Sequence, residues 1–517
     1  MALSSKQTVA KNTILLYVRT FIVLIISLVT SRILLQSLGV EDYGIYNAVG
    51  GFVAMFAVLT GSMSAAISRY ITFELGTGNC EKLKQVFSSS VIVQLIFIAV
   101  IILVAEAFGI WFLNEKMTIP ADRMIAANWV FQCTVVIFCV NLLSVPYNAE
   151  IIAHEHMKTY AYVSIVDNVF RLIIAYLIFI SPLDKLIFYA LLMTALSVGI
   201  RVFYQIYCTK RFEECKKISF KINRSVLKGL VGFASWNMLG EMASIFSHQG
   251  ISLVLNVFLG PLVNAAYGVA NQVNSAVLAF TNNFTTALSP SITKSYAEGS
   301  LVYMKNLVLQ GARYSYYLLL ILVVPLLIET ETVLHIWLKD VPAHSVIFVK
   351  LMLVYSLISI LSQTTIRAVQ ATGDIKRYQI IISTVSLLSL PLAYILLRFG
   401  FAPESALIAV LVVSFCTLIV RLIIVKPMIG ISIGEFAENV LLRCVLVSIF
   451  AFSAPYALHI IMPKSLIVTV IICFVSVLWT AGMCCFIGMS KAERNTFYSK
   501  TISIIKKKRK NSESDYE

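Results

Sequence analysis

The stretch that decides the fold spans residues 12–72 and reads NTILLYVRTFIVLIISLVTSRILLQSLGVEDYGIYNAVGGFVAMFAVLTGSMSAAISRYIT. Two long apolar runs flank a short turn at residues 38–42. Each run exceeds the roughly 20 residues that an α-helix needs to cross a bilayer of about 30 Å. The second run is rich in glycine, alanine and serine, which let helix backbones approach closely in lipid. The stretch therefore predicts a membrane hairpin that packs tightly against other helices.

The composition of the whole chain agrees with this interpretation. Of the 517 residues, 59% are hydrophobic and only 13% are charged, and the mean hydropathy is +0.86. Soluble globular proteins carry about 25% charged residues, so we expect an all-α, polytopic membrane protein. The net charge of +15 raises the question of a nucleic-acid partner. We expect none, because the basic residues lie in loops and in the tail rather than on one soluble face.

Hydropathy windows of about 19 residues predict fourteen transmembrane helices. The predicted spans are 13–37, 43–68, 87–113, 124–147, 160–180, 186–207, 229–258, 263–288, 314–337, 345–366, 379–398, 405–425, 438–461 and 465–488. In the span 314–337, acidic residues favour a helix that ends near Leu327 and a short surface helix after it.

Lysine and arginine residues gather in the even-numbered loops and at both ends of the chain, above all at residues 208–228 and in the KKKRK run at 506–510. This positive-inside pattern predicts a multi-pass membrane protein with both termini in the cytoplasm. The first apolar run is too long for a cleavable signal peptide, so we expect it to be its own insertion signal. Cys80, Cys208 and Cys215 then fall in cytoplasmic loops. No cysteine falls in an outer loop, so no disulfide framework is predicted.

An internal repeat relates the opening hairpin to a second one in the other half of the chain. Leu38-Gly39 falls on Leu259-Gly260, and the match continues without a gap to Gly78 and Gly299. The two hairpins are six predicted spans apart, so the halves share one orientation and an axis along the membrane normal. The repeat predicts an N-lobe of helices 1–6 (1–208), a basic cytoplasmic linker (209–228), a C-lobe of helices 7–12 (229–428), appended helices 13–14 (429–490) and a basic cytoplasmic tail (491–517).

Signatures of catalysis are missing from the sequence. There is no G-x-x-x-x-G-K-[ST] phosphate loop, no H-E-x-x-H and no constellation around a nucleophile. We therefore expect neither an enzyme nor an ATP-driven pump of that type, with no catalytic residue, no cofactor and no metal site. His154 and His156 form an H-x-H after the fourth span, which we interpret as a polar loop at the membrane interface.

Ionisable residues inside spans are the candidate functional groups, because each costs about 2.5–3.5 kcal/mol at a helix centre unless it meets a partner or water. Asp167 and Arg171 are four residues apart and share one helix face, so an ion pair between them is one interpretation. Glu241 and His248 are seven apart and are candidates for lining a cavity or for coupling. Residues nearer to span ends are expected to reach the interface with their long side chains: Arg32, Glu106, Arg201, Lys350 and Arg443.

Three stretches of the sequence resemble a known family. The motif SRILLQSLGVEDYGIYNAVGGF, the small-residue second span and the segment VPYNAEIIAHEHMKTYAYVSIVDNVFRLIIAY at residues 145–176 resemble the polysaccharide flippases of the multidrug/oligosaccharidyl-lipid/polysaccharide (MOP) exporter superfamily, most of all its Wzx-like branch for O-antigen and capsule.

The resemblance implies a two-lobed fold with a central cationic cavity. It implies transport of an undecaprenyl-pyrophosphate-linked oligosaccharide from the cytoplasmic to the outer leaflet of a bacterial inner membrane. By position in the first span, Arg19 and Arg32 resemble the family's lumen-facing cations, and we add Arg171 as a third candidate for substrate binding. The partners implied are the lipid-linked oligosaccharide, membrane lipids, and a polysaccharide polymerase or other assembly proteins.

Other functions remain open on the sequence alone. A cation-coupled multidrug or metabolite antiporter of the same superfamily is the main alternative, and Asp167 and Glu241 depart from a purely cationic lumen. A peptidoglycan-precursor flippase, a membrane scaffold and an integral glycosyltransferase are further alternatives. The short outer loops argue against the transferase.

Overall fold

A computed structural model describes residues 2–54, 57–115, 119–181, 184–219, 223–338, 341–463, 465–490 and 493–494. Over these ranges the chain is helical and contains no strand, which confirms the all-α prediction. The basic run at 506–510 and most of the tail lie outside the described residues.

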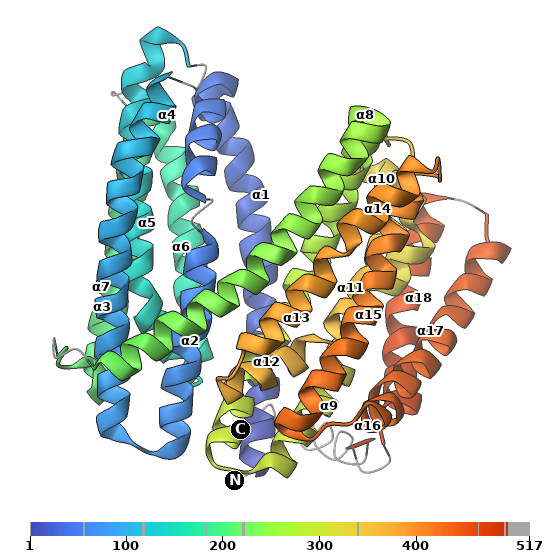
Figure 1. The fold of residues 1–517 in the computed structure, drawn as a ribbon. Helices are drawn as coiled ribbons and strands as arrows, with labels where there is room; N and C mark the ends of the chain where they lie inside the picture. The colour runs from blue at the N-terminus through green and yellow to red at the C-terminus, as the bar shows by residue number, and fades with distance from the viewer. Residues whose placement is uncertain are drawn as a thin grey trace, which may run out of the picture. The chain divides into compact units, whose positions relative to one another are not determined.

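The helices follow one another along the chain with short connections (Figure 1). Their bounds are α1 Ala2–Ala54, α2 Ala57–Thr77, α3 Cys80–Val104, α4 Ile110–Glu115, α5 Met124–Ala153, α6 Met157–Leu177, α7 Lys185–Arg211, α8 Arg224–Ala297, α9 Leu301–Ile328, α10 Thr330–Leu338, α11 Ser345–Ile360, α12 Gln363–Thr372, α13 Lys376–Leu387, α14 Ser389–Arg398, α15 Glu404–Ile429, α16 Ile433–Phe436, α17 Leu442–Ile461 and α18 Leu466–Met483. The break between α9 and α10 confirms that the ninth predicted span ends near Leu327 and is followed by a short helix.

The described chain divides into two compact units. Unit 1 comprises residues 1–246, 282–304 and 366–387, and unit 2 comprises residues 247–281, 305–365 and 388–517. Each unit therefore contains part of the long helix α8. The division into two lobes, a linker and an appended pair, which follows from the repeat, stays a prediction.

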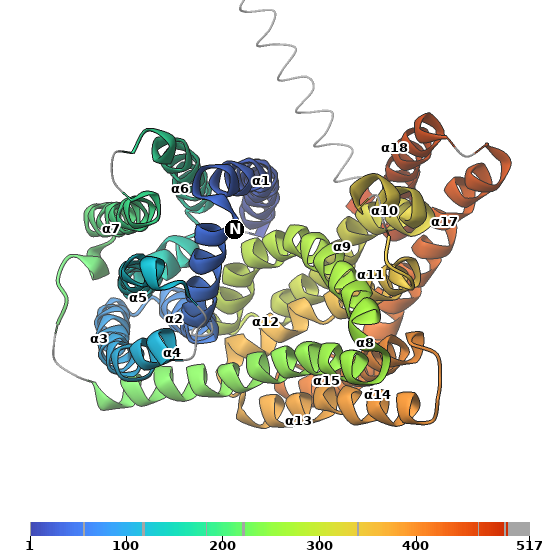
Figure 2. The same cartoon turned by 90° about the horizontal axis from the view of Figure 1, so that it is seen from above.

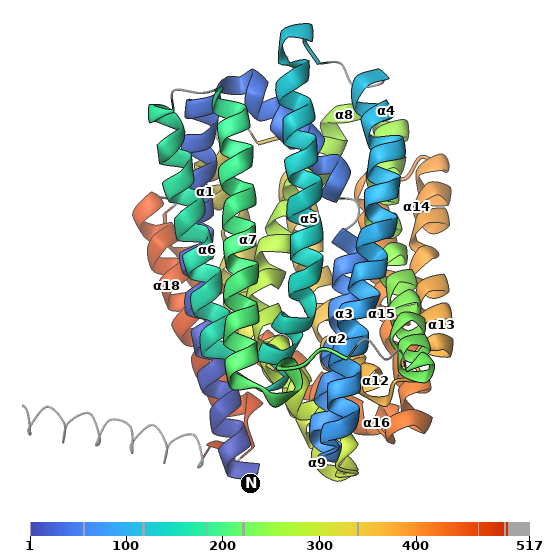
Figure 3. The same ribbon diagram turned by 90° about the vertical axis from the view of Figure 1, so that its left-hand side faces the viewer.

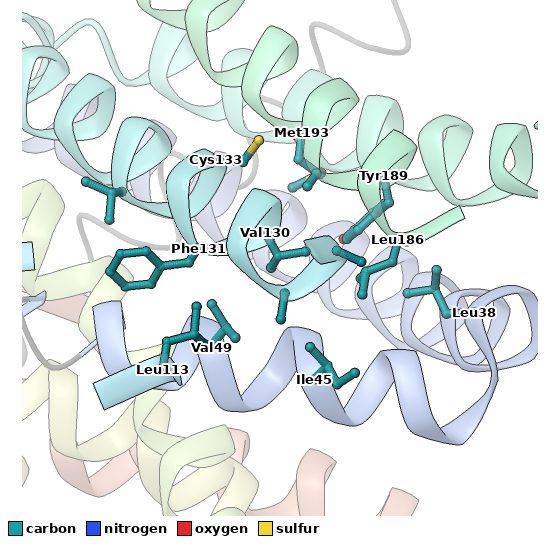
Figure 4. Close-up of a cluster of buried hydrophobic side chains, with 14 of the residues drawn as sticks. Leu38, Ile45, Val49, Leu113, Val130, Phe131, Cys133, Leu186, Tyr189 and Met193 are labelled. Carbon is teal, nitrogen blue, oxygen red and sulfur yellow. The ribbon is translucent and has the colours of Figure 1, made fainter. Parts of the chain in front are cut away.

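In unit 1, α5 is the central helix and contacts α1, α2, α3 and α7, while α6 packs on α1 (Figures 2 and 3). A buried cluster between these helices is drawn in Figure 4, where Val130 and Phe131 of α5 lie between side chains of α1 and α7. Its members include Leu38, Ile45 and Val49 from the opening stretch. Burial of such side chains stabilises the fold by about 1.5–3 kcal/mol each, so α5 is the element on which unit 1 packs.

In unit 2, α15 packs on α11 and α14, and α17 packs on α18. Hydrogen bonds tie α17 and α18 to the region of α9 and α10. The buried carboxylate of Glu329 lies 2.7 Å from His459 Nδ1 and accepts from Thr469 Oγ1 at 3.0 Å. Burial raises the pKa of Glu329, but these hydrogen bonds lower it by more than burial raises it. Its pKa therefore lies below the usual value. The contacts attach the last two helices to unit 2 through an ionised carboxylate.

Twelve helices among the described residues are long and apolar enough to cross a membrane. The two predicted spans outside this set are 43–68 and 263–288, which are the second helices of the two repeated hairpins. Both segments are helical where the structure describes them, but they carry many serine, threonine, asparagine and glycine residues. A side-chain composition suited to close packing lowers their hydropathy.

The repeat is visible in the backbone. Gly39 has φ 82° and ψ 171°, and Gly260 has φ 79° and ψ −177°. Gly78 and Gly299, which the repeat also pairs, have φ 71° and 73° at the ends of the second helices. L-residues with a side chain rarely adopt such conformations. Equal local geometry at both pairs supports the prediction that the two hairpins make equivalent turns.

An ion cluster of three side chains holds the first turn in unit 1. Arg123 donates to Asp42 through Nε at 2.8 Å and Nη2 at 2.5 Å, and to Asp184 through Nη1 at 2.6 Å. Burial raises the pKa of Asp184, but the hydrogen bonds from Arg123 and from the amides at the start of α7 lower it more, so its pKa lies below the usual value. One guanidinium thus joins the opening hairpin to α5 and to the N-terminus of α7.

We predict that Gly39→Ala and Gly260→Ala destabilise the protein by similar amounts, about 1–3 kcal/mol each, because the turn conformation is strained for any residue with a Cβ. A Cβ at either position meets no atom within 4 Å, so the loss arises from the backbone alone. Thermal melting of the purified protein in detergent measures the effect.

Gly44→Ala and Gly268→Ala are the matched controls, since both glycines have helical backbones and open space for a Cβ. They should leave the melting temperature unchanged or raise it slightly. A loss at Gly39 without one at Gly260 would contradict the equivalence of the two turns.

Candidate functional site

Arg19 lies in the first half of α1 in unit 1 and is partly buried. Its guanidinium carbon stands over the ring of Tyr160 on α6, 4.8 Å from the ring centroid. The buried Nε atom has no hydrogen-bond partner among the described residues, and none of the ion pairs within that part of the chain joins Arg19 to a carboxylate. The positive charge is therefore held by an aromatic face rather than neutralised.

Asp167 and Arg171 lie further along α6 and form the ion pair that their spacing predicts. Arg171 Nε donates to Asp167 Oδ2 at 3.1 Å, and both side chains are partly exposed. Tyr204 of α7 interacts electrostatically with both Asp167 and Arg19. The predicted charges of the first and fifth spans are thus brought to one region of unit 1.

We call this set the arginine–tyrosine seam: Arg19, Tyr160, Asp167, Arg171 and Tyr204. It lies between α1, α6 and α7, helices that contact one another. A seam of this kind offers guanidinium groups that bind phosphate oxygens beside aromatic rings.

Arg32 is also proposed from the sequence to bind substrate. It is exposed on α1, and the described contacts do not join it to the seam. Arg201, which is expected to reach the interface, contacts another helix. Its guanidinium lies over the ring of Tyr147, 4.2 Å from the centroid, and its buried Nε and Nη1 atoms have no hydrogen-bond partner in the described ranges. No pattern in the sequence points to this contact, because Tyr147 lies on another helix, α5, well before Arg201 in the chain.

Glu241 lies in a second polar group of unit 1. Its Oε1 accepts from Asn237 Nδ2 at 3.0 Å, one turn earlier on α8. Asn237 Oδ1 in turn accepts from Gln370 of α12 at 3.0 Å and from Gln379 of α13 at 3.4 Å. Asn237 and Gln379 are both buried, so this network fixes three helices around the carboxylate.

Small residues make room for the network. A Cβ at Gly61 of α2 would lie 3.1 Å from Glu241 Oε2, and a Cβ at Gly240 would lie 2.4 Å from Gln379 Oε1. Arg367 of α12 interacts electrostatically with Glu241 and donates to Gln370 Oε1 at 3.0 Å. Sequence reasoning found Glu241 but missed Asn237, Arg367, Gln370 and Gln379, which lie near span ends or are uncharged.

His248 belongs to unit 2 and has its own surroundings there. Its Nε2 is 3.4 Å from the Tyr355 hydroxyl, the two rings meet edge to face at 5.6 Å, and Tyr267 donates to its carbonyl oxygen at 3.2 Å. The proposal that Glu241 and His248 act together rests on their spacing alone. That they line a cavity stays a prediction.

Residues 9–296, more than half of the chain, match the family model described as "Polysaccharide biosynthesis protein". The uncharacterized membrane protein EpsK of Bacillus subtilis is 20% identical over 292 residues, which are 55% of this chain and 56% of that protein. The chain thus aligns with little more than half the length of this relative.

Solved structures share the fold. A crystal structure of a point mutant of a MATE protein covers 84% of this chain and 97% of its own with a TM-score of 0.73 at 13% identity. An outward-facing multidrug resistance MATE transporter of the MOP superfamily gives 0.72 at 12% identity over 82% of this chain and 96% of its own. A MOP superfamily transporter from Pyrococcus furiosus, whose binding pocket is described as having reverse polarity, gives 0.70 at 13% identity with the same shares covered. At these identities the likeness shows the fold alone.

We predict that Gly240→Ala destabilises the protein by about 1–2 kcal/mol, because Gln379 must turn away and a buried hydrogen bond to Asn237 is lost. Gly232→Ala on the same helix meets no atom within 4 Å and is the control. Both variants are compared by thermal melting in detergent. An unchanged melting temperature for Gly240→Ala would show that the network around Glu241 is not tightly packed.

Proposed function

The chain belongs to the polysaccharide biosynthesis protein family, and from this premise we propose that it is a flippase for a lipid-linked oligosaccharide. In this proposal it moves an undecaprenyl-pyrophosphate-linked oligosaccharide from the cytoplasmic to the outer leaflet of a bacterial inner membrane by alternating access. The product would serve the synthesis of O-antigen or capsular polysaccharide, with a polymerase and other assembly proteins as partners.

The single observation that carries the proposal is the arginine–tyrosine seam. A pyrophosphate has several oxygens that accept paired hydrogen bonds, and the arginine fork donates two parallel ones while remaining charged. Arg19 is held by a ring rather than by a carboxylate, so its charge is available to an anionic headgroup. Tyr160, which is partly buried, adds an aromatic face of the kind that commonly lines ligand pockets.

The cargo class also suits a membrane helix protein. A pyrophosphate-sugar headgroup cannot cross hydrocarbon without polar partners, whereas its lipid tail need not leave it. Charged groups within helices supply such partners only where they face the protein interior or water. In the proposal, a cationic site on helices α1 and α6 supplies these partners.

A cation-coupled antiporter is the second candidate, and the network around Glu241 favours it. A half-buried carboxylate held by an amide and close to Arg367 has the chemistry of a proton- or cation-binding group. One of the similar structures is described as a multidrug resistance transporter. Deletion of the gene separates the candidates: the flippase predicts lipid-linked glycan that accumulates in the cytoplasmic leaflet, and the antiporter predicts drug sensitivity with normal surface glycan.

The proposed orientation has both termini in the cytoplasm. We predict that Cys80 at the start of α3 is protected from a membrane-impermeant maleimide in intact spheroplasts and is labelled after permeabilisation. Of the three cysteines expected in cytoplasmic loops, Cys80 is exposed, while Cys208 and Cys215 are buried and would resist the reagent on either side. Labelling of Cys80 in intact spheroplasts would contradict the proposed orientation and would place this loop outside the cytoplasm.

We predict that Arg19→Gln and Arg171→Gln abolish surface glycan while the protein still reaches the membrane, with Arg171→Lys intermediate because it keeps the charge and loses the fork. Mass spectrometry of lipid-linked glycan and immunoblotting of membranes measure the two quantities. Arg398→Gln, at the exposed end of α14, is the control and should export normally.

A purely structural ion pair predicts a different pattern for Arg171. Arg171→Gln would then fail by loss of folded protein, because Asp167 would be left unpaired, and the double variant Arg171→Gln with Asp167→Asn would restore both protein and glycan. Normal export by well-expressed Arg19→Gln and Arg171→Gln would remove the basis of the proposed headgroup site.

A further inference from the structure

A group of three side chains in unit 1 lies outside the seam and outside the network around Glu241. Glu150 comes from the last turn of α5, His154 caps that helix, and Glu214 comes from the short helix η4 (Glu213–Cys215) after α7. One donor atom of each lies within 4.8 Å of the other two. Two carboxylates and one imidazole thus converge from segments that are distant along the chain.

Glu150 is the member that requires an explanation. It is fully buried, with 0% exposure, and neither carboxylate oxygen has a hydrogen-bond partner within the part of the chain that the structure describes. Tyr147 and Ile151, its neighbours along α5, and Phe212, on which His154 stacks, belong to a buried apolar cluster. A carboxylate in such a place is costly unless a cation or a proton neutralises it.

The other two groups are held in position around it. His154 Nε2 lies 2.7 Å from Glu214 Oε1 and 3.5 Å from Glu150 Oε2. The His154 ring is stacked on Phe212, with centroids 4.2 Å apart and planes at 15°. Since the ring is fixed by stacking, its Nε2 atom faces both carboxylates at once.

We propose that Glu150, His154 and Glu214 bind a zinc ion. Zinc takes imidazole nitrogen and carboxylate oxygen at about 2.0–2.2 Å in tetrahedral sites, which places neighbouring ligand atoms about 3.4 Å apart. The 3.5 Å between His154 and Glu150 already has this value, and the 2.7 Å between His154 and Glu214 needs a small opening. On binding, Nε2 releases any proton that it shares with Glu214 and coordinates through its lone pair.

The donor set favours zinc over the hard cations. Calcium takes six to eight oxygen ligands and magnesium keeps several waters in an octahedral shell, and a largely buried site with an imidazole fits neither. The neighbouring His156 is not part of the site, since its Nδ1 is 2.9 Å from the Tyr207 hydroxyl. The H-x-H pattern of the sequence therefore supplies one ligand rather than two.

The bound ion would join the end of α5 to the segment between α7 and α8. His154 already joins the two through Glu214, and the ion would add Glu150 to this connection. Zinc would thus brace this end of unit 1 independently of the proposed transport function.

The test uses the full chain purified in detergent, stripped with a chelator, and then exposed to zinc or to cobalt as its spectroscopic substitute. We expect the wild type to retain about one zinc per chain after dialysis and to melt several degrees higher with zinc. Cobalt should give a visible spectrum without a thiolate charge-transfer band, because oxygen and nitrogen are the ligands.

Glu150→Gln and His154→Gln should lose the retained metal and the melting shift. Without zinc, Glu150→Gln should melt at or above the wild type, because it removes an unpaired buried carboxylate; this outcome separates lost metal binding from a failure to fold. His156→Gln is the matched histidine control, and the double variant Cys208→Ser with Cys215→Ser controls for thiols. Both should keep the metal.

Three results would overturn the proposal. The wild type retains no zinc, or Glu150→Gln retains as much as the wild type, or the metal is lost with His156→Gln or with the cysteine pair while Glu150→Gln keeps it. The last result would place any zinc on other side chains.

Discussion

A charged side chain that lies away from water without a partner is costly, and this constraint accounts for the ion pairs that join distant segments of this chain. Such a group costs several kcal/mol in a low-dielectric surrounding, so a counterpart on the same helix or on another segment stabilises the charge. In unit 1 the pairs include Arg123 with Asp42 and Asp184, Arg171 with Asp167, and Lys294 with Glu155. In unit 2 they include Glu329 with His459 and Arg313 with Glu493. Most of them join segments that are far apart in sequence, so charge pairing adds to apolar packing in holding these segments together.

Local features of the fold could be predicted from the sequence because they depend on residues close together in the chain. Helical spans follow from hydropathy, and the Asp167–Arg171 pair follows from a spacing of four on one helix. The two turns at Gly39 and Gly260 follow from a repeat that needs no structure to be seen. Their shared left-handed φ shows why glycine stands at both positions: the turn needs a conformation that a Cβ would strain.

Contacts across helices could not be predicted, because a single sequence carries no information on which helix faces which. Arg201 has the position of an interfacial arginine but lies over Tyr147. His154 is the first histidine of the H-x-H pattern, yet its ring faces Glu150 and Glu214. Glu214 belongs to a segment beyond α7. Glu241 and His248 share a helix face by spacing, but the contacts described for each are made in different units. Periodicity gives a face of a helix and not the neighbour that covers it.

The two arginines of the seam are not equivalent as sites for an anion. Arg171 already donates to Asp167, so an incoming pyrophosphate must compete with a charge-assisted hydrogen bond worth about 1.5–3 kcal/mol. Arg19 is held by the ring of Tyr160, a contact worth about 0.5–2 kcal/mol, and a phosphate oxygen can approach the guanidinium while the ring stays in place. In the proposed transport function, Arg19 is therefore the first group to meet the headgroup, and Arg171 joins only where the ligand also separates it from Asp167. An ion pair that opens for the correct ligand and closes without it makes the site selective, because a weaker anion would leave the pair intact.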